Sequence, residues 1–353
     1  MWITSSLDTA LIPTAVALGN FDGLHQGHRR VIHPVVQSFN PGPRSPLQLV
    51  GHLSSGYEFP VSVMDSYAPG NFASSSNRPY STVVTFHPHP QEFFTGQPKK
   101  LLTPLDEKVE CLQSLGVEQL VLLPFSQALA ALSPEQFVEQ VLVQGLQARY
   151  ISVGFDFHFG KGRAGNAEGL RAIAHQHGIE VTVVPLYPSV QGERISSSMI
   201  RQALAEGDLG RVDELLGRPY QILGHVVQGQ QLGRTLGFPT ANLEVPPEKL
   251  LPKHGVYAVR VSLQGNNSSL IDYPGVMNIG CRPTVAGQNI TVEVYLLDWS
   301  GDLYGQTLRV TLVEFLRSEQ QFSSLENLKQ QIQIDCLAAR KVLSRESLIS
   351  ESE

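Results

Sequence analysis

Residues 19–28 read GNFDGLHQGH, and they follow the apolar run 15–18 and precede a helix that we expect to start near His28. The apolar run predicts a buried strand, so the glycines lie in a turn between a strand and a helix. Such a turn offers backbone N–H groups and the positive end of a helix dipole to a phosphate. His25 and His28 lie close enough in sequence to reach one group. A phosphate chain suits them better than a metal ion, because no cysteine or carboxylate cluster accompanies them. The glycines alone would equally fit an ordinary turn.

The composition limits the class of protein. The chain has 353 residues, and its 42% hydrophobic content is enough for two packed domains. The formal net charge of −6 gives no bulk attraction to nucleic acid or to an anionic membrane, so we expect neither as a partner. Cys111, Cys281 and Cys336 are few and far apart, which favours reduced thiols in a cytoplasmic protein. We expect no signal peptide and no membrane span, because no apolar run approaches about 18 residues.

Strands and helices are expected to alternate through the first half of the chain. The expected strands are residues 15–18, 81–86, 119–123 and 150–153, and the expected helices are residues 103–115, with Thr103 as N-cap, and 133–145. This alternation predicts a parallel, doubly wound α/β sheet of the Rossmann type, with ligands at the carboxyl ends of its strands. Residues 40–80 are rich in Pro, Gly, Ser and Asn, so we expect a disordered insertion there.

Two further segments of the first half carry polar groups that fit a ligand. Residues 154–160, GFDFHFG, place one acid among aromatic residues and glycines, which fits either a packed turn or a contact with a ligand. Residues 195–201, ISSSMIR, open a helix with hydroxyl groups and place Arg201 one turn further on, where it could grip a phosphate. A serine N-cap beside a surface arginine would give the same pattern.

The pattern changes after about Leu216. Short alternating runs at residues 256–263, 291–297 and 308–315, separated by Gly, Pro and Asn, predict an antiparallel β domain. We expect this domain to be a closed barrel. A helix that starts near Ser323 should cover the barrel with one apolar stripe, formed by Leu328, Ile332, Cys336 and Ala339. We therefore expect one domain at residues 1–216, a second at 217–345 and a tail at 346–353.

The second half carries its own candidate chemistry. Thr240 and Asn242 lie two apart on an extended segment, face the same way and could complete a Mg²⁺ shell together with nucleotide phosphates. Both residue types are also common in turns. Glu293 alternates with Val292 and Val294, so it lies on the opposite face of its strand. On the outer surface it would be a solvated charge, whereas as a general base it should face the ligand cavity of the barrel.

Several of these segments resemble one enzyme family. Residues 19–28 resemble the H-x-G-H signature of the nucleotidyltransferase superfamily, in the form found in bacterial FAD synthetases. The segments at 154–160 and 195–201 resemble the G-x-D-F-x-F-G and I-S-S-x-x-I-R elements of the same family. In the second half, G-x-x-x-G-R-x-x-G-F-P-T-A-N, N-I-G-x-R-P-T, V-E-V and L-R-S-E resemble riboflavin kinase. The family often has His after V-E-V, where this chain has Tyr295.

The resemblance implies a bifunctional riboflavin kinase and FMN adenylyltransferase, with Mg²⁺ as cofactor. The second domain would convert riboflavin and ATP to FMN, and the first would convert FMN and ATP to FAD and pyrophosphate. The implied catalytic residues are His25, His28 and Arg201 for adenylylation and Glu293 as the base for phosphorylation. The implied ATP contacts are Gly19, Asn20, Phe21, Gly27, Ser197, Ser198, Gly233, Arg234 and Gly237. The implied flavin contacts are Asp156, Phe157, Arg317 and Glu319, and the implied Mg²⁺ ligands are Thr240 and Asn242.

Two other functions remain open from the sequence. The chain could have one working site, with the other kept as a flavin-binding or regulatory remnant. It could also be a flavin-binding interaction protein without turnover, using the insertion to hold a partner. The oligomeric state cannot be predicted from this sequence.

Overall fold

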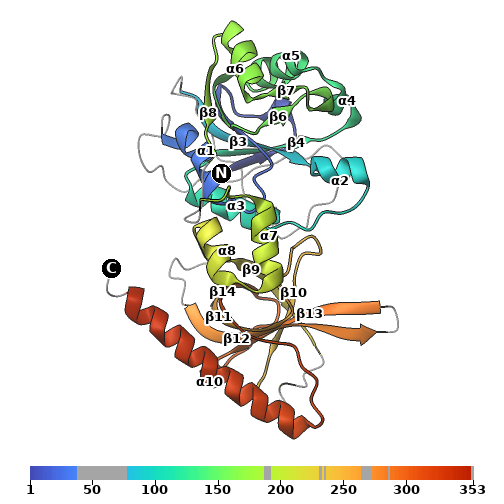
Figure 1. Ribbon diagram of the computed structural model, residues 1–353, viewed down its shortest axis with the longest axis vertical. Coiled ribbons are helices and arrows are strands. Elements are labelled where there is room, and N and C mark those ends of the chain that lie inside the picture. The colour runs from blue at the N-terminus through green and yellow to red at the C-terminus, as the bar shows by residue number, and fades with distance from the viewer. Residues whose placement is uncertain are drawn as a thin grey trace. The chain divides into compact units, whose positions relative to one another are not determined.

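The computed structural model describes residues 1–37, 78–186, 192–229, 233, 236–263, 272–284 and 287–350. Most of the expected insertion, residues 40–77, lies outside the described residues, and so does Arg234. The chain divides into two compact units, Met1–Ser196 and Ser197–Glu353 (Figure 1). The division falls before Leu216, so the expected boundary at that residue stays a prediction.

The first unit is built on a six-stranded sheet in the order β1-β4-β3-β2-β5-β8, and every strand pair is parallel. The strands are β1 (Trp2–Thr4), β2 (Thr14–Leu18), β3 (Tyr80–His87), β4 (Gln119–Pro124), β5 (Ala148–Gly154) and β8 (Glu180–Val184). A separate antiparallel pair consists of β6 (His158–Phe159) and β7 (Gly165–Asn166). The predicted doubly wound parallel sheet is confirmed.

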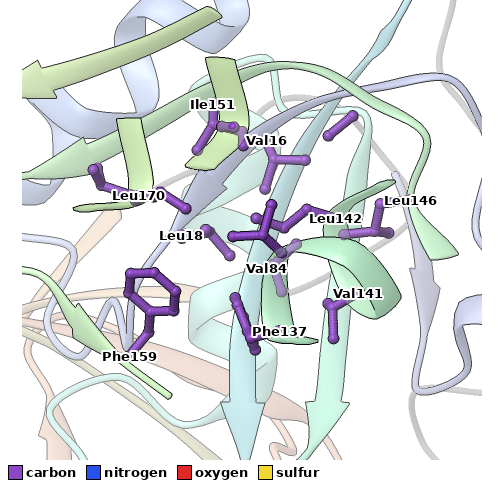
Figure 2. Packing of buried hydrophobic residues seen from close by; sticks show 14 of the residues in the cluster. Val16, Leu18, Val84, Phe137, Val141, Leu142, Leu146, Ile151, Phe159 and Leu170 are labelled. Carbon is purple, nitrogen blue, oxygen red and sulfur yellow. The ribbon is translucent and has the colours of Figure 1, made fainter. Parts of the chain in front are cut away.

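Helices cover both faces of this sheet. The helical elements are η1 (Leu7–Thr9), α1 (Gln26–Gln37), α2 (Pro90–Thr95), α3 (Leu105–Ser114), α4 (Gln127–Ala131), α5 (Pro134–Phe137), the π-helix η3 (Val138–Gly145), η4 (Lys161–Arg163) and α6 (Ala167–Gln176). Ala15 and Ala17 of β2 pack in one core cluster with α1 and α3. Val16 and Leu18 pack in the other, with α5, η3 and α6 (Figure 2). A strand buried on both faces has no polar position, which explains the continuous apolar run.

Two helix starts differ from the sequence-based expectation. Helix α1 begins at Gln26, slightly before His28. Helix α3 begins at Leu105 with Pro104 at the N-cap position, so the expected N-cap role of Thr103 is wrong. The Thr103 hydroxyl instead accepts a hydrogen bond from the backbone N–H of Gly23, 2.9 Å away. A contact with a distant loop has replaced the local cap.

The second unit contains a closed barrel in the order β10-β13-β12-β11-β14-β9, with antiparallel pairing throughout. Its strands are β9 (Gln221–Val227), β10 (Ala241–Glu244), β11 (Gly255–Leu263), β12 (Asp272–Thr284), β13 (Gly287–Leu296) and β14 (Thr307–Ser318). Its helices are α7 (Ser197–Glu206), α8 (Leu209–Leu216) and α10 (Leu325–Ser350). The predicted barrel is confirmed.

Helix α10 covers one side of the barrel wall. Cys336 and Ala339, from the predicted stripe, pack in a core cluster with Val256 and Ala258 of β11, and Ile332 lies against the same cluster. Helix α10 continues to Ser350, into the segment expected to be a tail. Among the described residues, no helix has the length and apolar character needed to cross a bilayer.

Candidate active sites

The first candidate site lies where the winding of the parallel sheet reverses. Strand β2 pairs with β3 on one side and with β5 on the other. The chain passes from β2 through α1 to β3, whereas it reaches β5 from β4 through η3. Open α/β sheets bind ligands at the carboxyl ends of strands at such a switch point. The GNFDGLHQGH loop follows β2 and the GFDFHFG loop follows β5, so two predicted segments meet at this position.

His25 and His28 form a stacked pair at this position. Their ring centroids lie 3.6 Å apart at an interplanar angle of 15°. Nδ1 of His25 accepts a hydrogen bond from the backbone N–H of His28 at 3.2 Å. Because Nδ1 acts as an acceptor, neutral His25 carries its proton on Nε2.

The environment of the pair favours uncharged imidazoles. Burial lowers the pKa of His25 to about 4, although the charge of Asp22 opposes this shift. Burial also lowers the pKa of His28 well below its ordinary value, and His25 and Lys108 lower it further. Within the part of the chain that the structure describes, buried Nδ1 of His28 has no hydrogen-bond partner. A buried polar atom without a partner is costly, so it marks a place where a ligand group fits.

The glycines and Phe21 shape the space around the pair. A Cβ atom on Gly27 would lie 3.2 Å from the His25 ring, and one on Gly19 would lie 3.1 Å from the Phe21 ring. Both positions therefore favour glycine. The Phe21 side chain is 1% exposed and meets His28 edge to face at 5.3 Å. Its ring thus supports His28 from the core, and any contact of Phe21 with ATP would come from its backbone.

The loop after β5 presents its acid and its aromatic residues differently. Asp156 forms an exposed ion pair with Arg194, a residue that the sequence analysis did not single out. Phe157, a predicted flavin contact, packs against the sheet core and stacks on Phe159 at 5.7 Å. The neighbouring ring of Phe155 is 59% exposed. Phe157 thus has a packing role, and its flavin contact stays a prediction.

An aromatic cluster beyond β3 and β4 was missed by the sequence analysis. Phe93 and Phe94 of α2 and Phe125 after β4 have ring centroids 5.3 to 5.7 Å apart. Phe94 is 70% exposed. Exposed rings of this size gathered at the carboxyl edge of a sheet fit a flat ligand. The available signal was the pair of adjacent phenylalanines, which carries no helical or strand periodicity.

Three predicted phosphate contacts lie at the start of the second unit. Helix α7 begins at Ser197, Ser198 is exposed, and Arg201 follows in the same helix. The predicted helix start is confirmed. Participation of these three residues in a site with the histidines stays a prediction.

The second candidate site is a row of polar residues across the barrel wall. Asn242 of β10 lies opposite Glu293 of β13, and Glu293 lies opposite Asn278 of β12. The row continues through Val256 of β11 to Arg317 of β14. Directly opposite residues in a sheet point to the same face, so the pairing brings four separate motifs together. The sequence analysis assigned no role to Asn278.

The row lies on the outer face of the barrel. Val256 packs with residues of the external helix α10. Val292 and Val294 are 4% and 0% exposed on the alternate face, whereas Glu293 is half-buried. The predicted alternation along β13 is confirmed. Glu293 thus lies on the face opposite these apolar side chains, and its role as a base that faces a ligand cavity stays a prediction.

Two glycines press against the predicted metal ligands. A Cβ atom on Gly229 would overlap the side chain of Asn242, and one on Gly233 would lie 3.1 Å from Oγ1 of Thr240. Gly233 also accepts a hydrogen bond at its carbonyl from the N–H of Phe238, 2.8 Å away. Gly237 has a φ of 90°, which favours glycine. The glycine backbone thus forms a cradle around two neutral oxygen donors.

The other end of the row is held by α10. Nε and Nη2 of Arg317 donate to the Asp335 carboxylate at 2.9 and 2.7 Å, and Asp335 is 5% exposed. The Glu319 carboxylate lies against Gly280, where a Cβ atom would collide with it. Arg317 and Glu319 are therefore ordered beside the row, and their contacts with flavin stay predictions.

The two sites define a class of protein. A glycine-rich loop with two histidines at the switch point of a parallel sheet, joined in one chain to a barrel that carries a row of polar residues, fits a two-site nucleotide-dependent transferase.

Comparison with known proteins gives the particular family. A family model described as FAD synthetase matches residues 70–199, and one described as riboflavin kinase matches residues 216–343. The bifunctional riboflavin kinase/FMN adenylyltransferase of Escherichia coli K12 is 38% identical over 92% of this chain and 91% of its own length. The Bacillus subtilis 168 protein of the same name is 33% identical over 91% of this chain and 90% of its own. The chain belongs to the bifunctional riboflavin kinase/FMN adenylyltransferase family.

The fold agrees with a solved structure. The crystal structure of a Streptococcus pneumoniae protein titled a macrolide-efflux protein is similar, with a TM-score of 0.74 and 27% sequence identity. The likeness covers 96% of this chain and 98% of that chain. The combination of a parallel sheet and an antiparallel barrel is therefore a known architecture.

Proposed function

We propose that each unit of this protein carries one of the two activities of its family. FMN adenylylation is assigned to the unit with the parallel sheet, and riboflavin phosphorylation to the unit with the barrel. This division rests on one observation, that each unit contains its own set of motif residues. The first unit contains the stacked histidines, and the second contains the row of polar residues across the barrel wall. The residue ranges of the two family models support the same division.

The adenylyl-transfer site works by positioning and by charge stabilisation. A phosphate oxygen of FMN attacks the α-phosphorus of ATP, the bond between this phosphorus and the oxygen bridging to the β-phosphate breaks, and pyrophosphate leaves. No protein nucleophile is needed. Nε2–H of His25 and the unpartnered Nδ1 of His28 are available to the phosphates. Bound Mg²⁺ would offset charge on the triphosphate.

The aromatic cluster supports a place for the flavin. The isoalloxazine ring is flat and apolar on its faces. Phe93 and Phe94 offer exposed rings at the carboxyl edge of the same sheet, beside half-buried Phe125. Asp156, on the loop after β5, would then contact a polar edge of the flavin or its chain. Replacement of Phe94 by Ala should raise the KM for FMN more than the KM for ATP.

The proposed kinase site is the row of polar residues across the barrel wall. The ribityl hydroxyl of riboflavin attacks the γ-phosphorus of ATP, its proton passes to the Glu293 carboxylate, and ADP leaves. Thr240 and Asn242 fit a Mg²⁺ site, since both offer neutral oxygens beside a glycine cradle where nucleotide phosphates can approach. The cation would neutralise charge on the transferred phosphoryl group. Asn278, opposite Glu293, is placed to orient the same hydroxyl.

One experiment tests the division and the two rival functions. Purified protein is incubated with riboflavin, ATP and Mg²⁺, and the flavins are separated by chromatography. Formation of FAD supports two working sites, FMN alone indicates one, and unchanged riboflavin indicates a binding protein. His28→Ala should stop the reaction at FMN, whereas Glu293→Gln should leave conversion of supplied FMN to FAD intact. Loss of both activities in either folded variant would contradict the division.

The cellular site and the cofactor follow from the same proposal. Cys111, Cys281 and Cys336 are all free thiols, which fits work in the reducing cytoplasm. Mg²⁺ dependence is expected of both half-reactions, because each acts on ATP.

A further inference from the structure

The loop that carries the histidine pair has an unusual backbone. Phe21 and Leu24 have φ angles of 48° and 45°, in the left-handed region that favours glycine, and Gly23 has a φ of 92°. The side chains of Phe21 and Leu24 are both 1% exposed. Strained residues of this kind persist only where the surrounding structure holds them, and they gather at functional sites. The contacts that hold this loop therefore decide the geometry of the site.

Most of the recorded polar contacts on this loop come from one neighbouring segment. Oδ1 of Asp22 accepts a hydrogen bond from the N–H of Leu102 at 2.8 Å, and the N–H of Gly23 donates to Oγ1 of Thr103. The carbonyl oxygen of Asn20 accepts from Nζ of Lys108, 3.2 Å away, and from Oγ1 of Thr85, 3.0 Å away. The segment that ends in the first turn of α3 thus contacts the loop at three positions, Asn20, Asp22 and Gly23.

Lys108 stands apart among these contacts because it is a buried cation. Lys108 is 9% exposed. Burial lowers the pKa of its ammonium group, whereas the charge of Asp22 raises this pKa. Burial of an ammonium group is costly, and an apolar side chain of similar length would fill the same space without that cost. Removal of the ammonium would leave the Asn20 carbonyl still bonded to Thr85. Packing and hydrogen-bond satisfaction thus give no reason for a lysine at this position, and its structural gain is that it offsets the charge of the buried Asp22 carboxylate.

We propose that Lys108 is a positioning residue for adenylyl transfer, which holds the Asn20 carbonyl and with it the strained loop that sets the histidine pair. Its charge also reaches His28, whose electrostatic environment includes Lys108. This inference rests on the assignment of adenylyl transfer to the first unit. A separate experiment tests that assignment, which would be wrong if His28→Ala makes FAD at the rate of the parent protein.

The test uses Lys108→Met, which keeps the length of the side chain and removes the ammonium. We expect kcat for adenylylation of supplied FMN to fall about 10²-fold with the KM for ATP changed by less than about threefold, since a small misplacement of reacting groups has an effect of this size. Riboflavin phosphorylation should stay unchanged, and urea unfolding should show a folded variant with a somewhat lower midpoint, because the Asp22 carboxylate loses its countercharge. Lys100→Met, at an exposed residue nearby, removes the same charge and should leave all three measurements unchanged.

Parent-like adenylylation by folded Lys108→Met would overturn the proposal. If this variant fails to fold, Lys108→Arg tests the proposal instead, because it keeps the positive charge and displaces the group that donates to the Asn20 carbonyl. A folded Lys108→Arg with reduced kcat and little change in KM supports positioning, whereas parent-like kcat overturns it. Failure of both variants to fold would make Lys108 a purely structural residue and would also overturn the proposal.

Discussion

The buried His25 makes the first unit sensitive to acid. Burial lowers the pKa of this imidazole from 6.5 to about 4, so between these values the unfolded chain binds a proton that the folded unit excludes. Proton uptake by the unfolded state means that stability falls as the pH falls through this window. The full shift corresponds to roughly 3 kcal/mol, and about 2 kcal/mol of it should be lost between pH 7 and pH 5.

Replacement of His25 by Asn isolates this effect. The Asn amide oxygen can take the place of Nδ1 as acceptor for the N–H of His28, and the side chain does not titrate. We therefore expect the free energy of unfolding of His25→Asn to fall by about 2 kcal/mol less than that of the parent between pH 7 and pH 5. His28 should retain an acid sensitivity of its own, because burial lowers its pKa as well.

The assay can be confined to the first unit. The chain has 2 tryptophans, Trp2 in the first unit and Trp299 in the second. In a Trp299→Phe background, fluorescence of Trp2 during urea unfolding reports on the unit that contains His25. His33→Asn, at an exposed position on α1, is the matched control and should behave like the parent. Equal pH dependence in His25→Asn and the parent would refute the argument from burial.

Three further predictions concern the chemistry. His28→Ala should lower the rate of FMN adenylylation by about 10² to 10³, because a preorganised donor to a developing charge is worth roughly 3 kcal/mol or more, while riboflavin phosphorylation measured on the same sample stays unchanged. Glu293→Gln should slow riboflavin phosphorylation by roughly 10² to 10⁴ and leave adenylylation near the parent rate; unimpaired phosphorylation would exclude Glu293 as the base. Deletion of residues 41–77 with a short Gly/Ser linker should leave both turnover numbers within a few fold, since this segment is poor in periodic apolar residues and Arg78 keeps its two hydrogen bonds to Glu118. A soluble deletion variant that no longer makes FAD would show that the segment belongs to the site.

The fold was predictable because the burial of each segment determines the spacing of its apolar residues along the sequence. Strand β2 is buried at every position since helices cover both of its faces, and β13 alternates between buried and less buried residues since only one face is interior. Local chemistry also sufficed where it had no competitor: Ser133 caps α5 through a capping box with Gln136, at the residue where the sequence predicts a helix to start. The prediction of an N-cap at Thr103 failed, because its hydroxyl accepts a hydrogen bond from the N–H of Gly23 instead. This contact joins residues that are distant in the sequence.

The missing parts of the sites share the same cause. Asn278 gains its position from the register between β12 and β13, and a single strand does not specify its register with another. Lys108 lies in the first turn of a helix beside two acids, which is typical of a solvated surface, and its burial depends on how α3 packs against the loop. The sequence thus singled out the groups to which we assign chemistry and missed those that we propose position them.

The residues assigned to the two sites also share an electrostatic property. The histidine pair is neutral at pH 7, because burial lowers both pKa values, and Thr240 and Asn242 are neutral oxygen donors. Arg317 is paired with Asp335, and the ammonium of Lys108 lies buried on a carbonyl. With Arg201 set aside, these groups would neutralise little of the charge on a triphosphate. The cation that accompanies ATP must therefore supply most of the neutralising charge, so nucleotide affinity at both sites should depend on the Mg²⁺ concentration more steeply than flavin affinity does.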